Sequence, residues 1–215
     1  MSKQFRSFYW KRWHSLAGMI PVGFFIILHW YSNSFAAMGA AKYNYHFSQT
    51  LFNPWMLTLE IVFLYIPLAF HLILGLSFIF KAKYNFKTYS YLDNWRFMLQ
   101  RLSGLGVALF IGAHFIMTRG HSWFAKDGWV NGMPKEGWYA HMQTAMQHNL
   151  TFAVYFLGIL GAAYHLGNGL WTFFNTMGWS KGATAQAKMK IFSMAIIVLL
   201  IVMGLYPLFI LRGIL

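Results

Sequence analysis

Five long apolar stretches constrain the fold of this 215-residue chain more than any other feature. A helix needs about 20 mostly apolar residues to cross the hydrocarbon core of a bilayer. Hydrophobic residues make up 58% of the sequence and charged residues 10%, whereas soluble domains carry roughly a quarter of their residues as charges. We therefore predict an all-α integral membrane protein with a single domain over residues 1–215. Its five transmembrane helices are expected at residues 15–35, 55–80, 97–118, 149–174 and 189–211.

The composition also excludes several classes of protein. The sequence contains no cysteine, which excludes disulfides, cysteine-ligated iron–sulfur clusters, thiolate nucleophiles and covalently attached c-type haem. Disorder requires low hydrophobicity and high charge, the opposite of this composition. The net charge is +13, but in so apolar a chain basic residues are typical of the cytoplasmic edge of a membrane and not of a nucleic-acid site.

The basic residues are distributed unevenly between the two sides that five helices create. Twelve lysines and arginines precede helix 1 or lie around the connections between helices 2 and 3 and between helices 4 and 5, and five lie on the other side. The richer side is normally cytoplasmic. We therefore predict a multi-pass protein of the bacterial inner membrane with a cytoplasmic N-terminus and an external C-terminus. The longest connection, residues 119–148, is then external, with a short interfacial helix expected near residues 138–147.

Four of the nine histidines lie well inside the expected helices. Ionisable residues at membrane depth are rare and usually functional. His29 and His114 fall in the outer halves of helices 1 and 3, whereas His71 and His165 fall in the inner halves of helices 2 and 4. The four residues thus form two pairs at two depths of the membrane.

This arrangement predicts two haem sites. Two imidazoles from facing helices are what a six-coordinate, non-covalent b-type haem requires, and helix-bundle cores commonly hold such sites. We predict that helices 1–4 form a bundle around two b haems, one between His71 and His165 and one between His29 and His114. A zinc or copper site would need all four histidines at one depth. Without a metal, the histidines would be neutral core residues bonded to backbone carbonyls or, in a haem-free transporter or scaffold, would relay protons or only pack.

Glycines accompany the histidines of the inner pair. They lie four residues away along the helix: Gly75 after His71, and Gly161 and Gly169 on either side of His165. Residues four apart share a helix face, so these glycines offer a porphyrin shallow helix surface, although small residues also serve plain helix packing in membranes. The glycines noted for the outer pair are eleven and ten residues away: Gly18 before His29 and Gly104 before His114.

Helix 2 carries two further unusual residues. Pro67 lacks a backbone donor, so we expect it to free a carbonyl and kink the helix. Glu60 is the one acid of four that lies inside a predicted helix, 11 residues before His71. Eleven residues make almost three full turns, which places Glu60 on the face of His71 and about 16 Å outward. We predict that Glu60 exchanges the protons of two-electron quinone chemistry; the alternative is a bond to a neighbouring helix or a haem propionate.

Three segments carry a resemblance to a known family: Arg12–Gly18 (RWHSLAG), Leu99–Gly104 (LQRLSG) and His165–Trp171 (HLGNGLW). Together with the helix order and the four histidine positions, they make the chain similar, over essentially its whole length, to the cytochrome b membrane-anchor subunit of succinate:quinone oxidoreductases (complex II). It resembles in particular the single-subunit, five-helix, di-haem anchors that use menaquinone, which are related to quinol:fumarate reductases.

The resemblance implies roles for the four membrane histidines. His71 and His165 match the axial ligands of an inner, higher-potential haem. His29 and His114 match those of an outer, lower-potential haem. The ligand pairs that the resemblance implies are therefore the pairs that the helix depths predict.

The resemblance also implies a group of residues around the propionates of the inner haem. Ser15 matches a residue near these carboxylates. His14, Trp95 and Arg101 are expected at the same level, where they bond or neutralise them. For Arg101 the alternative is a snorkelling interface residue, which is compatible with that role.

Partners and a reaction follow from the same resemblance. Flavoprotein and iron–sulfur subunits are expected on the cytoplasmic face, near the basic N-terminus and Lys81, Lys83 and Lys87. Electrons from succinate would pass through the iron–sulfur subunit and the two haems to menaquinone near Glu60, or in reverse for fumarate reduction. The chain is then the membrane subunit of an enzyme, with the dicarboxylate chemistry on a partner. The competing interpretations are a di-haem anchor of a hydrogenase or formate dehydrogenase, and a haem-free transporter or scaffold.

Overall fold

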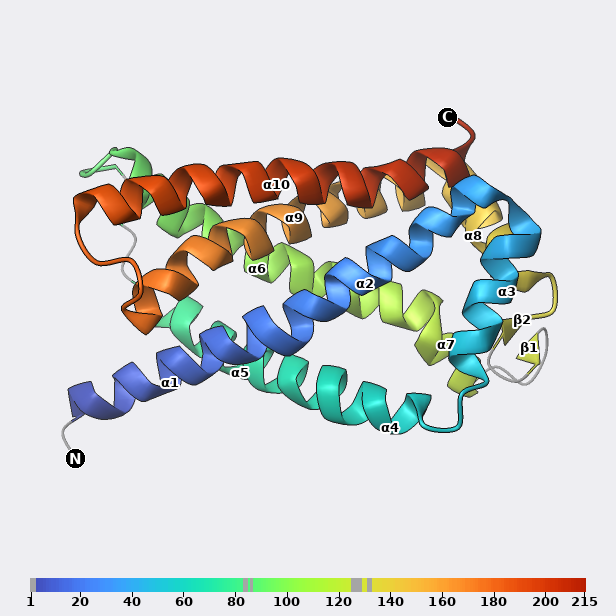
Figure 1. Cartoon of the computed structure of the whole chain (residues 1–215), viewed down its shortest axis with the longest axis horizontal. Coiled ribbons are helices and arrows are strands. Elements are labelled where there is room, and N and C mark those ends of the chain that lie inside the picture. Colours follow the sequence, from blue (N-terminus) through green and yellow to red (C-terminus); the bar gives the residue numbers. More distant parts are fainter. Residues whose placement is uncertain (1–2, 83–84, 86, 125–128, 131–132) are drawn as a thin grey trace.

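The computed structural model describes residues 3–82, 85, 87–124, 129–130 and 133–215. Residues 3–7, 122–124 and 129–130 are described by their backbone alone. Lys83 and Lys126, which entered the comparison of basic residues, lie outside the described residues. Both termini can be followed in Figure 1, where they lie at opposite ends of the long axis of the molecule. Opposite ends are what an odd number of membrane crossings requires.

Five helices in the described part of the chain are long and apolar enough to cross a membrane. They are Phe8–Met38, Met56–Phe80, Leu92–Met117, Asn149–Met177 and Ala183–Arg212, referred to below as spans 1 to 5. The predicted all-α, five-helix membrane fold is confirmed. Spans 1, 3 and 5 begin five to seven residues before their predicted starts, because apolar content alone does not register the polar and aromatic residues that extend a helix into the interface.

Spans 1 and 2 are built from several helical pieces. Span 1 consists of α1 (Lys3–Ala17), the π-helix η1 (Gly18–Val22), α2 (Gly23–Ser34) and the 3₁₀-helix η2 (Phe35–Met38). Span 2 consists of α4 (Met56–Glu60), the π-helix η3 (Ile61–Tyr65) and α5 (Ile66–Phe80). Spans 3, 4 and 5 are the uninterrupted helices α6 (Leu92–Met117), α9 (Asn149–Met177) and α10 (Ala183–Arg212).

The two π-helices coincide with prolines. Pro21 lies inside η1, and Pro67 is the second residue of α5, directly after η3. A proline cannot donate the backbone hydrogen bond of an α-helix, and one widened turn lets the neighbouring carbonyls find other donors. The irregularity predicted at Pro67 is therefore a π-turn just before the proline.

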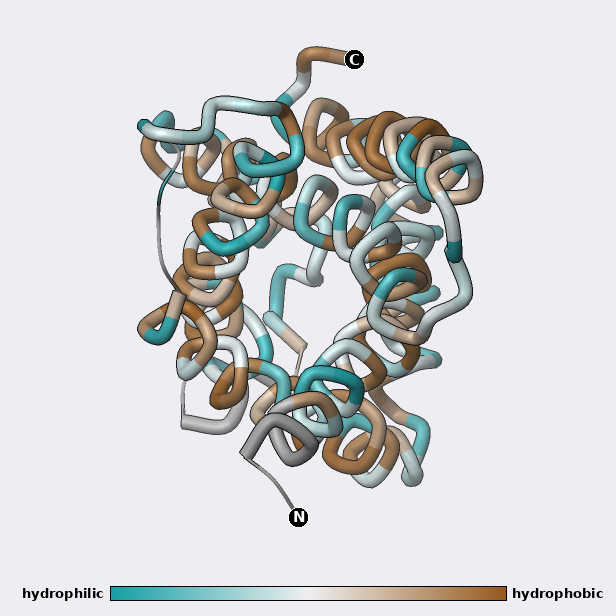
Figure 2. The backbone as a smooth tube through the Cα atoms, turned by 90° about the vertical axis from the view of Figure 1, so that its left-hand side faces the viewer, coloured by the Kyte–Doolittle hydropathy of each residue, from teal (hydrophilic) through white to brown (hydrophobic). Residues whose placement is uncertain are grey.

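The spans surround the centre of the molecule, as Figure 2 shows in a view along the long axis. Packing is uneven among them: a third of the apolar window of spans 4 and 5 is buried, but none of that of span 2. α10 packs against α9 and α2, and α5 packs mainly against α1. Span 2 thus borders the centre of the bundle without contributing buried residues to its core.

A cap of short elements covers the end of the molecule opposite the N-terminus (Figure 1). It comprises α3 (Ala40–Leu51), α7 (Arg119–Phe124), the antiparallel strands β1 (Trp129–Val130) and β2 (Met133–Pro134), and α8 (Gly137–Gln147). The helix expected near residues 138–147 is confirmed as α8. α3 was not predicted, because its apolar content is too low to reveal a membrane helix; its amphipathic pattern is the signal that marks it as a helix.

Polar side chains fasten this cap to the spans. Tyr43 of α3 is buried, which raises the pKa of its phenol, and its hydroxyl donates to Asn33 Oδ1 of α2 at 2.8 Å. The backbone N–H of Tyr139 in α8 donates to Asn44 Oδ1 at 2.9 Å. At the end of α10, Arg212 donates to the carbonyl of Met146 and to Asn149 Oδ1. Spans 1, 4 and 5 are therefore linked through the cap.

Close approach of α9 and α10 depends on Gly167. A Cβ at this position would overlap Ile197 Cγ1 and lie 3.2 Å from the Ile197 backbone nitrogen. We expect Gly167→Ala to lower the free energy of unfolding by about 1–3 kcal/mol, because backbone cannot move aside as a flexible side chain can. Thermal unfolding of the detergent-solubilised chain measures this change.

Gly106→Ala is the matched control. It substitutes a glycine of α6 whose Cβ would meet nothing within 4 Å. The control is expected to unfold as the unsubstituted chain does. Equal destabilisation of both variants would contradict the packing assigned to Gly167.

Candidate functional site

One cavity of about 2180 Å³ extends along the centre of the bundle. Spans 1 to 4 all contribute lining residues, and the four membrane histidines are among them. His14 and Lys81 line the cavity toward the N-terminal end of span 1, and Glu60 and Arg119 line it toward the cap. The candidate site is therefore a long cavity that runs through the bundle and is partly open at its sides.

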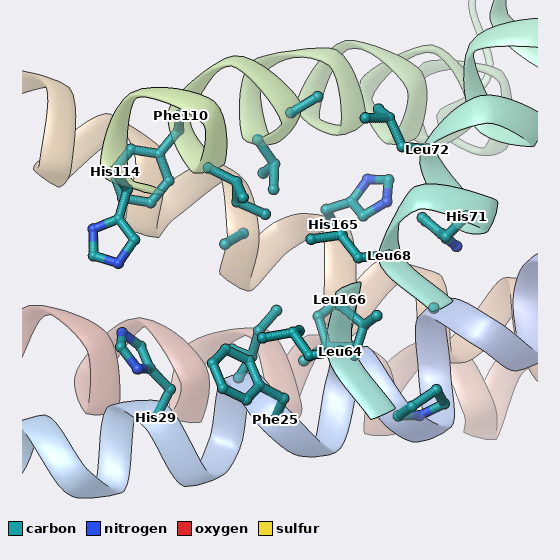
Figure 3. Close-up of a pocket in the computed structure, with 18 of the residues that line it drawn as sticks. Phe25, His29, Leu64, Leu68, His71, Leu72, Phe110, His114, His165 and Leu166 are labelled. Atoms are coloured by element: carbon teal, nitrogen blue, oxygen red, sulfur yellow. The ribbon is translucent and has the colours of Figure 1, made fainter. Parts of the chain in front are cut away.

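Two histidines meet near the N-terminal end of the molecule. His71 comes from α5 and His165 from α9, and their ring centres are 6.1 Å apart with an interplanar angle of 86°. Figure 3 shows both rings beside the same part of the cavity. The structure thus brings together the pair that the sequence predicted for the inner level.

The other two histidines meet nearer the cap. His29 comes from α2 and His114 from α6, with ring centres 5.7 Å apart and an interplanar angle of 75°. In Figure 3 they face each other, and Phe25 lies between this pair and the first. The structure therefore brings the predicted pairs together at both levels, and the role of these residues as ligands stays a prediction. Among the described residues, no group of three or more His, Cys, Asp or Glu side chains is arranged around one metal position.

Hydrogen bonds fix the ring orientation of the inner pair. His71 Nδ1 lies 2.9 Å from the carbonyl oxygen of His14, and His165 Nδ1 lies 3.0 Å from that of Gln100. A carbonyl can only accept, so each Nδ1 carries the proton and each Nε2 is left as a lone-pair donor. This is the tautomer that metal-binding histidines adopt when a second group orients them.

The outer pair is held by side chains instead. His114 Nδ1 lies 3.0 Å from the Tyr155 hydroxyl of α9, and His29 Nε2 lies 3.3 Å from the amide nitrogen of Asn33. Asn33 also accepts the hydrogen bond from Tyr43, so the outer pair is connected to the cap. Sequence reasoning missed Tyr155, Gln100 and Asn33. Polar residues inside apolar helices were the available signal, but their partners lie on other spans or depend on side-chain geometry.

His14 joins the inner level as a third histidine. Its ring stacks on that of His71, with centres 3.9 Å apart and an interplanar angle of 11°. His14 Nδ1 is buried and has no hydrogen-bond partner among the described residues. An orphaned polar atom of this kind indicates a position where a further polar group fits.

Of the other residues predicted near the inner level, two line the cavity and one does not. Ser15 and Arg101 line the cavity. The Arg101 guanidinium lies over the ring of Phe97, 3.4 Å from its centre, and donates to the Phe97 carbonyl. Trp95 is 38% exposed and lies outside the lining of the cavity. The structure therefore brings His14, Ser15 and Arg101 to the cavity and leaves Trp95 beside the bundle.

Two glycines take positions other than those expected. Gly18 and Gly104 were associated with the outer pair from their spacing, but they face the inner one. A Cβ at Gly104 would lie 2.7 Å from His165 Cε1, and one at Gly18 would overlap the His71 ring. The spacing along one helix misled the assignment, because each glycine faces a histidine on a different span.

Glu60 lines the cavity near the cap, on the face predicted for it. Its carboxylate accepts from Arg119 at 3.0 Å, and the two side chains are 16% and 20% exposed. Tyr65 lies beside the pair. Arg119 was predicted only as a loop charge, although it follows span 3 by two residues. Glu60 is therefore joined to the start of α7 by an ion pair, and not by a neutral bond.

The fold and the cavity define a class: a multi-span α-helical membrane protein with paired histidines facing a long internal space. No family model matches the chain. The succinate dehydrogenase cytochrome b558 subunit of Bacillus subtilis (strain 168) is 35% identical to it over 206 residues, which is 95% of this chain and 96% of that protein. The chain belongs to the family of succinate dehydrogenase cytochrome b subunits, and the predicted resemblance is confirmed.

The Glu60–Arg119 ion pair gives a testable prediction. We expect Glu60→Gln and Arg119→Gln each to destabilise the chain, because each leaves a partly buried charge without its partner. The double variant is expected to lose less than the sum of the two, with a coupling of roughly 0.5–3 kcal/mol. Thermal unfolding of the four proteins in one detergent measures this, and strictly additive losses would contradict the pairing.

Proposed function

We propose that this chain is the membrane anchor of a succinate dehydrogenase and carries electrons between an iron–sulfur subunit and menaquinone. The single observation that carries the proposal is the pairing of His71 with His165 and of His29 with His114 across one cavity. The family supports the role of anchor, since the relative is a cytochrome b558 subunit of succinate dehydrogenase. Haem b is the cofactor that this name implies.

The distances within each pair fit a bis-histidine haem. Two imidazoles that share one metal have ring centres about 6 Å apart, because each metal–nitrogen bond is about 2 Å and each nitrogen lies about 1 Å from its ring centre. The observed separations are 6.1 Å and 5.7 Å. The cavity of about 2180 Å³ exceeds the roughly 300–1,000 Å³ of a typical cofactor site, as two such groups require.

The chain's own residues supply ligation and orientation. His71 and His165 would hold the inner haem b, and His29 and His114 the outer one. When bound, such a group exchanges single electrons and has no open coordination position for oxygen. The bonds of His71 and His165 to backbone carbonyls fix both rings and leave each Nε2 as the lone-pair donor, so that little ordering is needed on binding.

Residues near the inner pair provide partners for propionates. Arg101 carries a charge at the cavity wall, Ser15 adds a hydroxyl there, and the buried His14 Nδ1 is available for a hydrogen bond. Charge-assisted bonds of this kind bind carboxylates strongly. Trp95 enters this group by resemblance alone, because it lies outside the lining.

Quinone chemistry is assigned to the end of the cavity near the cap. Glu60, Arg119 and Tyr65 meet there and line the space beside the outer pair. Reducing menaquinone to menaquinol consumes two protons, and the Glu60 carboxylate would take up a proton and pass it on to a quinone oxygen within its reach. Arg119 positions the Glu60 carboxylate and balances its charge.

The soluble partners are assigned to the opposite end. Flavoprotein and iron–sulfur subunits would bind on the cytoplasmic face, where Arg12, Lys81 and Lys87 lie beside the inner pair's end of the bundle. The excess of basic residues at this end supports a cytoplasmic N-terminus in the bacterial inner membrane. The cap then faces outside, and protons are exchanged near that surface.

Haem content tests the ligand assignment. We expect the purified chain to hold about two b haems, and His71→Ala to hold one, because one of the two histidines that would hold the inner haem is lost. A pyridine haemochrome assay with a reduced-minus-oxidised spectrum measures both. His141→Ala, which changes a histidine of α8 in the cap, is the control and retains two. Absence of haem from a folded, haem-supplied preparation would overturn the proposal.

Quinone reduction tests the role of Glu60. In the complete complex, Glu60→Gln is expected to lower succinate:menaquinone reductase activity by about 10²-fold or more, because the proton donor is lost. Reduction of a soluble dye by the partner subunits should be unchanged. Glu136→Gln, which alters an exposed carboxylate paired with His141, is the matched control. Full activity of Glu60→Gln with both haems in place would show that the protons take another route.

A further inference from the structure

Arg96 of α6 is a buried cation in the same half of the bundle as His71 and His165. Its side chain lies between spans 3, 4 and 5, and the residue is 6% exposed. Arg96 Nε donates to Asn168 Oδ1 at 2.7 Å, and Nη2 donates to Ser193 Oγ at 3.1 Å. The guanidinium also lies over the Trp171 ring, 4.6 Å from its centre. All of these partners are neutral.

No carboxylate forms an ion pair with Arg96 in the described part of the chain. Glu60 pairs with Arg119, Asp93 with Lys190 and Glu136 with His141, and Asp127 lies outside the described residues. Burying a charge without a counter-charge is costly. The position therefore carries a net positive charge that only dipoles and a ring face stabilise.

A directed chain of hydrogen bonds connects this charge to His165. Asn168 Nδ2 donates to Gln100 Oε1 at 2.7 Å, and Gln100 Nε2 donates to the His165 carbonyl at 3.0 Å. The carbonyl of Gln100 in turn accepts from His165 Nδ1. Arginine can only donate, so it fixes the Asn168 oxygen toward itself and thereby the orientation of both amides. Asn168 is fully buried, and water cannot substitute for these bonds.

The outer level lacks a comparable charge among the described residues. Its histidines are oriented by the neutral Tyr155 and Asn33. The cation nearest to it along the cavity, Arg119, is balanced by Glu60. Arg101 at the inner level would be balanced by the carboxylates that it is proposed to bind. Arg96 is thus the unbalanced charge that distinguishes the two levels.

We propose that Arg96 is a positioning residue whose fixed charge raises the reduction potential of the inner haem relative to the outer one. This inference rests on the proposed function, in which His165 is a ligand. A nearby positive charge favours the reduced state, which carries one positive charge less. The asymmetry between the two levels would then favour electron arrival at the inner level, the one nearest the proposed iron–sulfur partner.

Redox titration of the purified complete complex, followed in the absorption bands of the haems, tests the proposal. Arg96→Gln is expected to lower the reduction equilibrium constant of the inner haem about tenfold, which is about 59 mV for one electron. The outer haem should change by less than about twofold, since the field of a charge falls with distance. The inner haem is identified as the one that His71→Ala lacks. Arg96→Lys keeps the charge and is expected to leave the equilibrium constant of the inner haem close to that of the unsubstituted complex.

Two further variants separate this charge from general effects. Lys188→Gln removes an exposed cation near the start of α10, at the same end of the bundle; it should leave the inner haem unshifted. Asn168→Asp keeps Arg96 and neutralises it through an ion pair, so it should lower the constant as Arg96→Gln does. Asn168→Asp therefore tests the proposal even if Arg96→Gln fails to fold.

The outcomes distinguish this inference from the proposed function. An inner haem unshifted in Arg96→Gln and Asn168→Asp, or shifted equally in Lys188→Gln, overturns the role of Arg96 and leaves the haem sites intact. Equal shifts of both haems also overturn it. A complex in which this chain holds no haem by pyridine haemochrome assay overturns the proposed function itself.

Discussion

The absence of water inside a bilayer is the constraint on which this structure depends. Backbone groups must find partners within their own segment, so the apolar stretches become helices, and the prolines of spans 1 and 2 are absorbed by π-turns. The same constraint acts on side chains. Within the described spans, the four membrane histidines and Arg96 all have hydrogen-bond partners. Polar groups at this depth are therefore held in defined orientations as a condition of folding, and a functional site can use them.

Some spans of the bundle pack closely against each other, whereas others mainly border the cavity. Spans 4 and 5 approach closely through Gly167, and buried residues concentrate there. Span 2 contributes none of the buried residues of its apolar window, yet it supplies His71 and Glu60 to the cavity. A helix that borders a cavity on one side and lipid on the other has few protein partners. Bound cofactors would then complete the packing of span 2, which links cofactor binding to folding.

Charge is balanced differently at the two ends of the cavity. Near the cap, Glu60 and Arg119 form an ion pair beside the outer histidines. Near the N-terminal end, Arg96 is stabilised by Asn168, Ser193 and Trp171, which are all neutral. Electrostatic effects are strong where water is excluded, so this difference bears directly on the proposed electron transfer. The end near the cap is held neutral, and the end near the N-terminus is held positive.

Sequence patterns were sufficient to predict the membrane class, the five spans, the pairing of the four histidines, and the face on which Glu60 lies. Each follows from a local or periodic property: apolar length, and the angle and rise per residue of a helix. Contacts between spans set the rest: the ion pair of Glu60 with Arg119, the placement of Gly18 and Gly104 against the inner histidines, and the chain from Arg96 to His165. A helix pattern gives the depth and face of a residue, but the neighbour it meets depends on how separate helices pack around a shared space.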